Sequence, residues 1–276
     1  MKRMILGGAA LLAGLLPNAF ASTITNGTFA IGGTLYVTNF STSAITTPGG
    51  TCPASASGMA CIFWADTAGT GNGLADISAT GLPNGDIPTS IAGNDAANIS
   101  QLTTPPEVVG TAFAPTTFMT FNNGGITTQL DISFIDPGIY SAAACGAAAA
   151  VGQQCTLPGS LFSFVNNPPA VPAGGPGAPC GTGCQAEANF VLEGVTSGNP
   201  GKQSTWAANL RSGFPVGMPY QSVFALLSSQ GYVSNTFSGT ITLTAPSTVP
   251  EPGTMVFFLT GAGLIGLCAL LRRRMA

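Results

Sequence analysis

Residues 126–135, Ile-Thr-Thr-Gln-Leu-Asp-Ile-Ser-Phe-Ile, alternate between apolar and polar side chains over most of their length. In an extended chain Leu130, Ile132 and Phe134 lie on one side and the intervening polar residues on the other. A period of two is typical of a strand with one buried face, whereas a helix has a period of 3.6. The segment therefore predicts a sheet that covers a hydrophobic core on one side.

The segments around residues 126–135 extend this prediction through the chain. Residues 117–121 and a turn at 122–125 complete a β-hairpin. Further strands are expected at 34–40, 61–64, 74–80, 161–165, 187–196, 204–212 and 232–244. Residues 83–106 are expected to be mostly loop. Residues 219–230 are the one segment that favours a helix, with Pro219 at its first turn and Gly231 just past its end. The fold class predicted for this body is mainly β, an antiparallel β-sandwich with one short helix.

The N-terminus has the three parts of a secretory signal peptide. Lys2 and Arg3 precede an apolar stretch that is too short to span a membrane, and Ala19 and Ala21 provide a small-residue cleavage site. We expect residues 1–21 to be removed, so that the mature chain begins at Ser22.

The C-terminus also has three parts. Pro250, Glu251 and Pro252 come first, and their prolines favour an extended, exposed stalk. Residues 254–271 carry no charge and, as a helix, would span about 27 Å, which suits a bilayer. The chain then ends in a basic cluster that would stay on the cytoplasmic side. This cluster consists of Arg272, Arg273 and Arg274. We therefore predict a transmembrane helix at 254–271.

This arrangement resembles the PEP-CTERM sorting signal: a Pro-Glu-Pro tripeptide, a short apolar helix and a terminal arginine cluster, in that order. The resemblance covers residues 249–276 and implies processing by an exosortase, a membrane-embedded enzyme of Gram-negative bacteria. Cleavage near Pro250–Pro252 would follow a transient stay in the inner membrane and leave the exported body, residues 22–248, at the cell surface or outside the cell. The family is associated with exopolysaccharide and biofilm.

The charge of the body excludes one class of partner. Outside the two ends, only Lys202 and Arg211 are basic, against nine acidic residues, which gives a formal charge of −7. Nucleic-acid binding requires Lys and Arg to contact phosphates, so no nucleic-acid partner is expected.

Cysteine usage fits an oxidising compartment. Cys268 lies in the apolar tail, and six cysteines remain in the body, an even number that is typical of disulfides in exported proteins. Their proximity along the chain favours the local pairs Cys52–Cys61, Cys145–Cys155 and Cys180–Cys184 over the other connectivities. Zinc binding by Cys180 and Cys184 is the alternative, but the chain has no histidine. Four of these cysteines lie in residues 141–185, an Ala/Gly/Pro-rich insert.

Catalytic sites are poorly supported by the sequence. Without histidine, neither a Ser-His-Asp nor a Cys-His set can form. Two pairs of acidic residues could act as the two carboxylates of a glycosidase. They are Asp131 with Asp136 and Glu187 with Glu193. We expect Asp131 and Glu193 to be on the solvent face of strands and Asp136 in a turn, so no catalytic residue is assigned.

The sequence suggests two binding functions. Asp and Asn residues in loops provide the oxygen ligands that Ca²⁺ prefers, but they match no calcium-loop motif. We therefore interpret them as turn residues, and neither a metal nor a cofactor is assigned. These residues are Asp66, Asn72, Asn84, Asp86, Asn94 and Asp95. The second function is sugar binding on an exposed aromatic platform, for which the candidates are Trp64, Trp206, Tyr36 and Tyr232.

The function predicted from these observations is that of a non-enzymatic, exported protein of the cell surface or extracellular matrix, associated with exopolysaccharide or biofilm. The alternatives are a carbohydrate-binding module and, less favoured, a glycoside hydrolase.

Overall fold

A computed structural model describes residues 26–39, 41–54, 60–66, 74–78, 95–99, 102, 108–123, 126–168, 175–180, 183–197 and 203–245. The signal-peptide residues and the whole sorting tail, with its tripeptide, apolar segment and arginines, lie outside this set. The chain divides into two units, Met1–Ala245 and Pro246–Ala276, and every described residue belongs to the first. In this part of the chain, no helix combines the length and apolarity that crossing a membrane requires.

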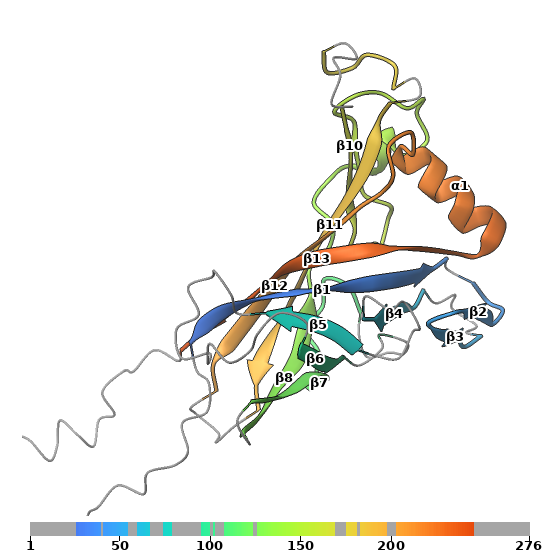
Figure 1. The fold of residues 1–276 in the computed structure, drawn as a ribbon. Helices are drawn as coiled ribbons and strands as arrows, with labels where there is room; N and C mark the ends of the chain where they lie inside the picture. Colours follow the sequence, from blue (N-terminus) through green and yellow to red (C-terminus); the bar gives the residue numbers. More distant parts are fainter. Residues whose placement is uncertain are drawn as a thin grey trace, which may run out of the picture. The chain divides into compact units, whose positions relative to one another are not determined.

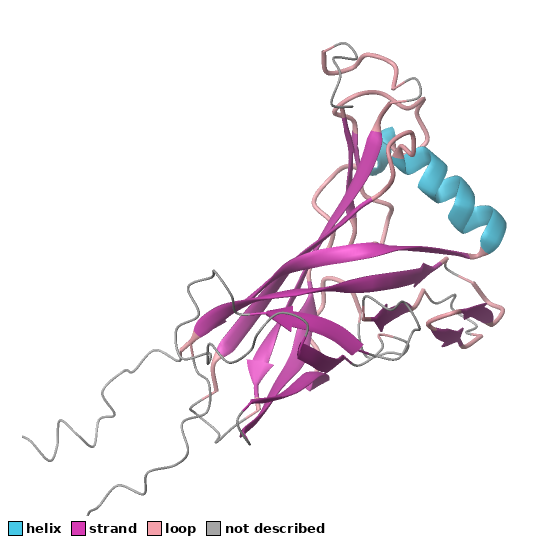
Figure 2. Cartoon of the chain, in the orientation of Figure 1, coloured by secondary structure: helices cyan, strands magenta, loops and turns pink. Residues whose placement is uncertain are grey.

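Most of the described residues form strands (Figures 1 and 2). The strands are β1 (Gly27–Thr38), β2 (Ile45–Thr47), β3 (Gly50–Cys52), β4 (Ile62–Ala65), β5 (Leu74–Ser78), β6 (Asp95–Ile99), β7 (Thr116–Asn123), β8 (Ile126–Ile135), β9 (Gln154–Cys155), β10 (Ser163–Asn167), β11 (Gln185–Thr196), β12 (Thr205–Gly213) and β13 (Tyr232–Thr244). A 3-10 turn, η1 (Ala142–Ala144), and one helix, α1 (Tyr220–Gln230), complete the set. The predicted mainly β body with one short helix is confirmed.

The predicted sandwich of two sheets is corrected to one large antiparallel sheet. Its 11 strands follow the order β12-β13-β1-β5-β6-β7-β8-β11-β10-β9, with β4 paired to β1, while β2 and β3 form a separate hairpin. β11 also pairs with β12, so the hydrogen-bonded order returns to its starting point. A period of two identifies which face of a strand is buried, but it does not reveal whether the opposite wall of the core belongs to a second sheet or to the same one.

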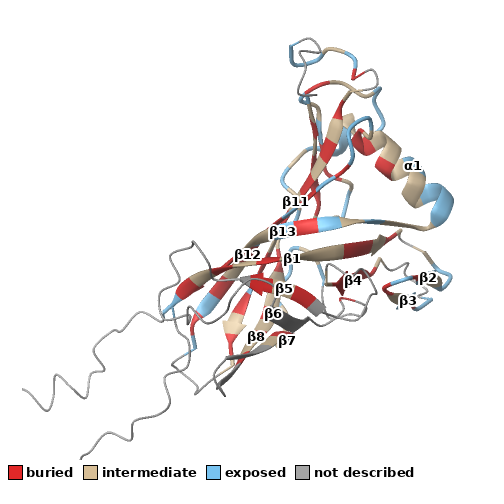
Figure 3. Cartoon of the chain, in the orientation of Figure 1, coloured by how far each residue is buried: buried red, intermediate tan, exposed pale blue. Residues whose placement is uncertain are grey.

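The core lies inside this closed arrangement of strands. Along β11 and β12 buried and more exposed residues alternate, as the sequence predicted for Phe190, Leu192 and Trp206 (Figure 3). Phe118 stacks on Trp206 at 5.5 Å between ring centroids, and Trp64 meets Phe118 edge-on at 5.9 Å. Aromatic contacts from β4, β7 and β12 therefore join strands that are far apart in the sequence.

Gly194 allows the closest approach between two of these strands. At this residue the pairing of β11 with β8 shifts register. A β-carbon here would collide with the carbonyl of Asp131 and lie 2.7 Å from the Trp206 indole. The indole Nε1 donates to the carbonyls of Asp131 (3.1 Å) and Val195 (3.2 Å). Glycine thus lets Trp206 close the junction of β8 and β11.

Helix α1 has the predicted ends. Pro219 precedes it in an extended conformation, and Gly231 ends it with φ of 81°. The N–H of Gly231 bonds to the carbonyl of Leu227, and this left-handed cap favours glycine. Tyr220 and Val223 are the buried residues of the helix.

The loop predicted at 83–106 is wrong in part. Asp95–Ile99 forms β6 between β5 and β7, and Leu102 pairs with Ile62 in an isolated bridge. Asp-Ala-Ala-Asn-Ile lacks a period-two pattern. The edges of β5 and β7 supply hydrogen-bond partners for the backbone of this segment. Such a tertiary contact is not revealed by the local sequence.

Candidate functional site

All three predicted disulfides are confirmed. The Cα–Cα distances are 5.6 Å for Cys52–Cys61 and 5.1 Å for both Cys145–Cys155 and Cys180–Cys184. Cys52–Cys61 belongs to a small cluster of buried residues on β1, β3 and β4. Cys145–Cys155 links the turn after η1 to β9, and Cys155 reaches the main core. The pairing excludes zinc binding by Cys180 and Cys184 in this oxidised form, because neither sulfur is a thiolate.

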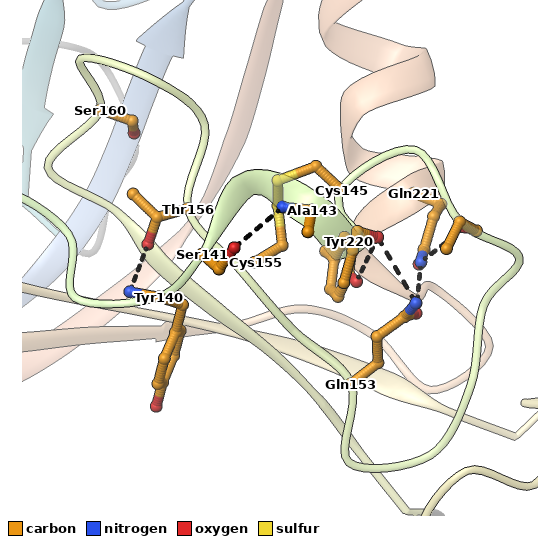
Figure 4. Close-up of a disulfide and its surroundings, with 12 residues drawn as sticks. Tyr140, Ser141, Ala143, Cys145, Gln153, Cys155, Thr156, Ser160, Tyr220 and Gln221 are labelled. Carbon is orange, nitrogen blue, oxygen red and sulfur yellow. Dashed lines mark hydrogen bonds between the residues drawn. A yellow bond between two sulfur atoms is a disulfide. The ribbon is translucent and has the colours of Figure 1, made fainter.

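Helix α1 is attached to the disulfide-bearing insert by side-chain hydrogen bonds (Figure 4). Asn166 of β10 is fully buried, and its Oδ1 accepts from the N–H of Tyr220 at 2.9 Å, while its Nδ2 donates to Gln221 Oε1 at 3.1 Å. The Tyr220 hydroxyl donates to the carbonyl of Ala144 at 3.1 Å. Asn166 therefore caps the helix from a distant strand, where Pro219 has no side chain to do so.

Gln153 extends this network. It accepts from Gln221 Nε2 at 2.7 Å and donates to the carbonyl of Ala144 at 3.4 Å (Figure 4). Burial raises the pKa of the Tyr220 phenol above its usual 10.0, and the hydrogen bond with Gln221 opposes this rise. The network stabilises the packing of helix and insert, and it offers no nucleophile with an adjacent base.

The prediction of an exposed aromatic platform for sugar binding is wrong, because its side chains are buried or partly buried. Trp64, Trp206 and Tyr36 are 0%, 2% and 6% exposed, so none of them can stack on a ligand at the surface. Tyr232 is partly buried and packs against the cluster that contains Tyr36. The candidate aromatics serve the hydrophobic interior, because a period-two strand buries its large side chains on the core face.

One of the two candidate carboxylate pairs, Glu187 and Glu193, does not meet the geometry of a glycosidase. Glu187 and Glu193 lie six residues apart in β11, about 20 Å along an extended strand, whereas glycosidase pairs are within about 10 Å. Asp131, on β8, accepts hydrogen bonds from Gln129 and Ser197. Asp136 follows the end of β8, five residues beyond Asp131. Asp131 and Glu193 are both on the outward side of their strands, as predicted.

No cluster of three or more His, Cys, Asp or Glu side chains that could hold a metal is found among the described residues. Of the candidate calcium ligands, Asn72, Asn84, Asp86 and Asn94 lie outside that part of the chain. The calcium hypothesis thus receives no support from the described residues.

The outward side of β1, β11, β12 and β13 carries hydroxyl and amide groups, and we call it the hydroxyl face. Its members are Thr28, Thr34, Asn189, Asn209, Arg211, Thr236, Ser238, Thr240 and Thr242. Thr28 lies opposite Thr242, with 3.4 Å between their hydroxyls. Above Asn189, Asn209 and Arg211 the surface has a shallow hollow of about 410 Å³. Arg211 is the one basic side chain within the described ranges.

A second, mostly apolar cavity of about 360 Å³ lies beneath α1. It is lined by Phe224 and Leu227 of the helix, by the facing ends of β1 and β13, and by the loop before β10. Neither the cavity nor the hydroxyl face was predicted from the sequence. A signal for the cavity was present at Asn235, a polar residue between Val233 and Phe237 on the inward side of β13.

Residues 248–274 match the model of the PEP-CTERM protein-sorting motif. The chain therefore carries the sorting signal that its sequence predicted. This motif indicates an exosortase substrate that is exported and sorted to the cell surface. Searches of curated proteins and of solved structures returned no match for the chain.

Proposed function

We propose that the chain is a non-enzymatic protein of the cell surface or extracellular matrix that associates with exopolysaccharide, as in a biofilm. The sorting motif at residues 248–274 is the observation that carries this proposal, because it gives the exported body a destination outside the cell. The tail would span the inner membrane transiently at 254–271. Cleavage by exosortase near Pro250–Pro252 would then separate it from the body.

The hydroxyl face supports contact with a neutral polysaccharide. Thr and Ser hydroxyls and Asn amides both donate and accept hydrogen bonds, so they match the hydroxyls of sugars. The long ladder between β1 and β13 holds these groups in regular rows, and the hollow over Asn209 and Arg211 offers a place for a polymer segment. This face replaces the aromatic platform as the site of the alternative carbohydrate-binding function.

Deletion of residues 250–276 tests the sorting part of the proposal. An epitope tag is inserted at Gly146, where an added β-carbon would meet no atom within 4 Å apart from those of its chain neighbours. We expect the full chain to be shortened and to reach the cell surface, while the truncated chain remains unprocessed and is lost from the surface. Unchanged localisation and processing of the truncated chain would overturn the proposal.

Co-sedimentation with the host's own exopolysaccharide tests the polymer contact. Asn209→Leu combined with Thr240→Leu removes neighbouring polar groups from the hydroxyl face, which pair across β12 and β13. Gln230→Leu, on the exposed end of α1, is the matched control. We expect the double variant to bind several-fold less than wild type and the control to bind normally. Equal binding by all three proteins would exclude this face.

Absence of catalysis is tested by incubating the protein with panels of glycosides and esters. We expect no turnover above background. Turnover that is lost in an Asp131→Asn or Glu193→Gln variant would instead identify a hydrolase.

A further inference from the structure

The cavity beneath α1 is bounded mainly by apolar side chains that come from five parts of the fold. They include Leu35 of β1, Ile62 of β4, Ile135 of β8, Phe164 of β10 and Phe224 of α1. Leu35, Ile62, Ile135 and Phe164 are each at most 5% exposed, so the inner wall belongs to the packed interior. Val108, which is 55% exposed, also lines the cavity and places part of it near the surface. A cavity of about 360 Å³ has room for a small molecule.

Five polar residues interrupt this apolar wall, which are Thr38, Asn39, Ser160 and the hydrogen-bonded pair Ser212 and Asn235. Ser212 on β12 and Asn235 on β13 both occupy the inward side of their strands and both line the cavity. The Ser212 hydroxyl donates to the carbonyl of Thr236 at 2.9 Å, so it can only accept from Asn235 Nδ2, which lies 3.0 Å away.

These two hydrogen bonds fix the orientation of the Asn235 amide. Its Nδ2 must face Ser212, and its Oδ1 receives no hydrogen bond from any described residue. Asn235 lines the cavity, and an amide oxygen that keeps its acceptor capacity can hold the polar group of a ligand there. Ser212 is 2% exposed, so the pair is anchored in the interior and is not a surface feature.

We propose that this cavity binds a neutral apolar small molecule with a single hydroxyl group, such as a medium-chain alcohol, and that the hydroxyl donates to Asn235 Oδ1. The apolar body of the ligand contacts Phe164, Phe224 and Leu227. This activity is independent of polymer contact, because the hydroxyl face is on the opposite, outward side of β12 and β13.

Charge decides between an alcohol and a fatty acid. Among the described residues that line the cavity, none is Lys, Arg, Asp or Glu. A carboxylate placed there would lose its hydration without gaining a cation, which is costly. A hydroxyl loses less and regains a hydrogen bond at Asn235, so the neutral ligand is favoured.

Photo-crosslinking of the full chain in nanodiscs tests the proposal, because the labelled residue reports the position of the probe. The probe is a diazirine derivative of 1-decanol, and peptide mass spectrometry locates the label. We expect labelling of residues around Leu35, Val108, Phe164 and Leu227, with competition by 1-decanol and little competition by decanoate at neutral pH. Labelling confined to other segments, or equal competition by decanoate, would overturn the proposal.

Cavity-filling variants provide a second test of the proposed binding site. Val233→Trp and Ala60→Trp each place a large ring at a lining position that is only partly buried. Ile139→Trp is the matched control, since Ile139 is 80% exposed and does not line the cavity. We expect labelling to fall about tenfold in the filled variants and to stay unchanged in the control, because a filled pocket excludes the probe. Circular dichroism identifies any variant that fails to fold, and undiminished labelling in a folded filled variant would overturn the proposal.

Asn235→Leu tests the polar contact alone. In the wild-type chain, 1-decanol should compete about fivefold better than decyl methyl ether, which cannot donate a hydrogen bond. The variant should lose this preference and still bind the probe. A wild-type protein that does not distinguish the two competitors would overturn the role of Asn235.

Discussion

The neighbouring strands β1, β11, β12 and β13, which we call the long strands, and the insert at residues 141–185 are stabilised in different ways. β1 and β13 pair along 12 consecutive positions, and on their other sides β1 pairs with β4 and β5 and β13 with β12, so backbone hydrogen bonds hold both strands. The insert has only the short strands β9 and β10, and it relies on two disulfides and on side chains that bond to the backbone, such as Gln153. Long paired strands need no covalent cross-links. An irregular segment needs them to offset the conformational entropy that it loses when it becomes ordered.

The two regions nevertheless share one core. Cys155, Phe162 and Phe164 of the insert belong to the same buried cluster as Trp206 and Ile241 of the long strands. Disturbing the long strands should therefore unfold the whole body, whereas disturbing the cross-links should loosen the insert first.

Trp206→Ala should give the largest effect. It removes a 2% exposed side chain that stacks on Phe118 and bonds to the carbonyls at the junction of β8 and β11. We expect a loss of about 3–5 kcal/mol in the free energy of unfolding, measured by denaturant titration. Val216→Ala, at a 68% exposed position, should change it by less than about 0.5 kcal/mol. If only the insert lost hydrogen-exchange protection in Trp206→Ala, the shared core would be contradicted.

Replacing both Cys145 and Cys155 with alanine should have the next largest effect. The bond closes a loop with a sequence separation of 10, for which the chain-entropy model gives about 2–3 kcal/mol. Hydrogen exchange should show loss of protection in η1, β9 and the start of α1, with β1 and β13 still protected. The matched replacement of Cys180 and Cys184, with a separation of 4, should cost less. A uniform loss of protection over the body would mean that the insert and the strands unfold as one unit.

Local sequence patterns predicted the structure where neighbouring residues determine it. The alternation of Phe190 and Leu192 with their neighbours predicted the buried face of β11, and Pro219 with Gly231 predicted the ends of α1. Short spacing between cysteines predicted the disulfides, because nearby residues meet readily.

Local patterns did not predict the structure where the deciding contact comes from a distant part of the chain. The pairing of β11 with β12 as well as β8 depends on Gly194 lying under Trp206, and β6 depends on the edges beside it. The cap that Asn166 provides for α1 joins residues 54 apart. The aromatic platform failed for a related reason, since a sequence shows where Trp64 stands in a strand but not how completely the other strands cover it.

Asn166→Ala tests the attachment of the helix to the insert. It removes the acceptor of the Tyr220 N–H, a buried hydrogen bond, and the donor to Gln221, a partly buried one. We expect a loss of about 1–2 kcal/mol in the free energy of unfolding, the usual cost of a helix cap. Asn167→Ala is the matched control, because Asn167 bonds to Glu187 at a partly buried site. An equal effect in both variants would contradict a special role for the cap.

Tyr220→Phe is expected to have the smallest effect at neutral pH and a distinctive effect at alkaline pH. Loss of the hydrogen bond to the carbonyl of Ala144 should cost about 0.5–1.5 kcal/mol at pH 7. Burial raises the pKa of this phenol above 10.0, so it ionises less readily in the folded chain than in the unfolded one. Its contribution to stability is therefore complete below about pH 10 and is lost as the pH rises through the folded-state pKa.

Phenylalanine cannot ionise, so the stability of Tyr220→Phe should decline less steeply above pH 10 than that of wild type. The other three tyrosines are common to both proteins, and the difference between the two curves isolates Tyr220. Denaturant titrations between neutral pH and pH 11 measure both curves, which should converge at the alkaline end. Parallel curves would show that the phenol ionises equally well in the folded and unfolded chains. In that case the junction between α1 and the insert would be open to water, and the contrast between the two regions would rest on the disulfides alone.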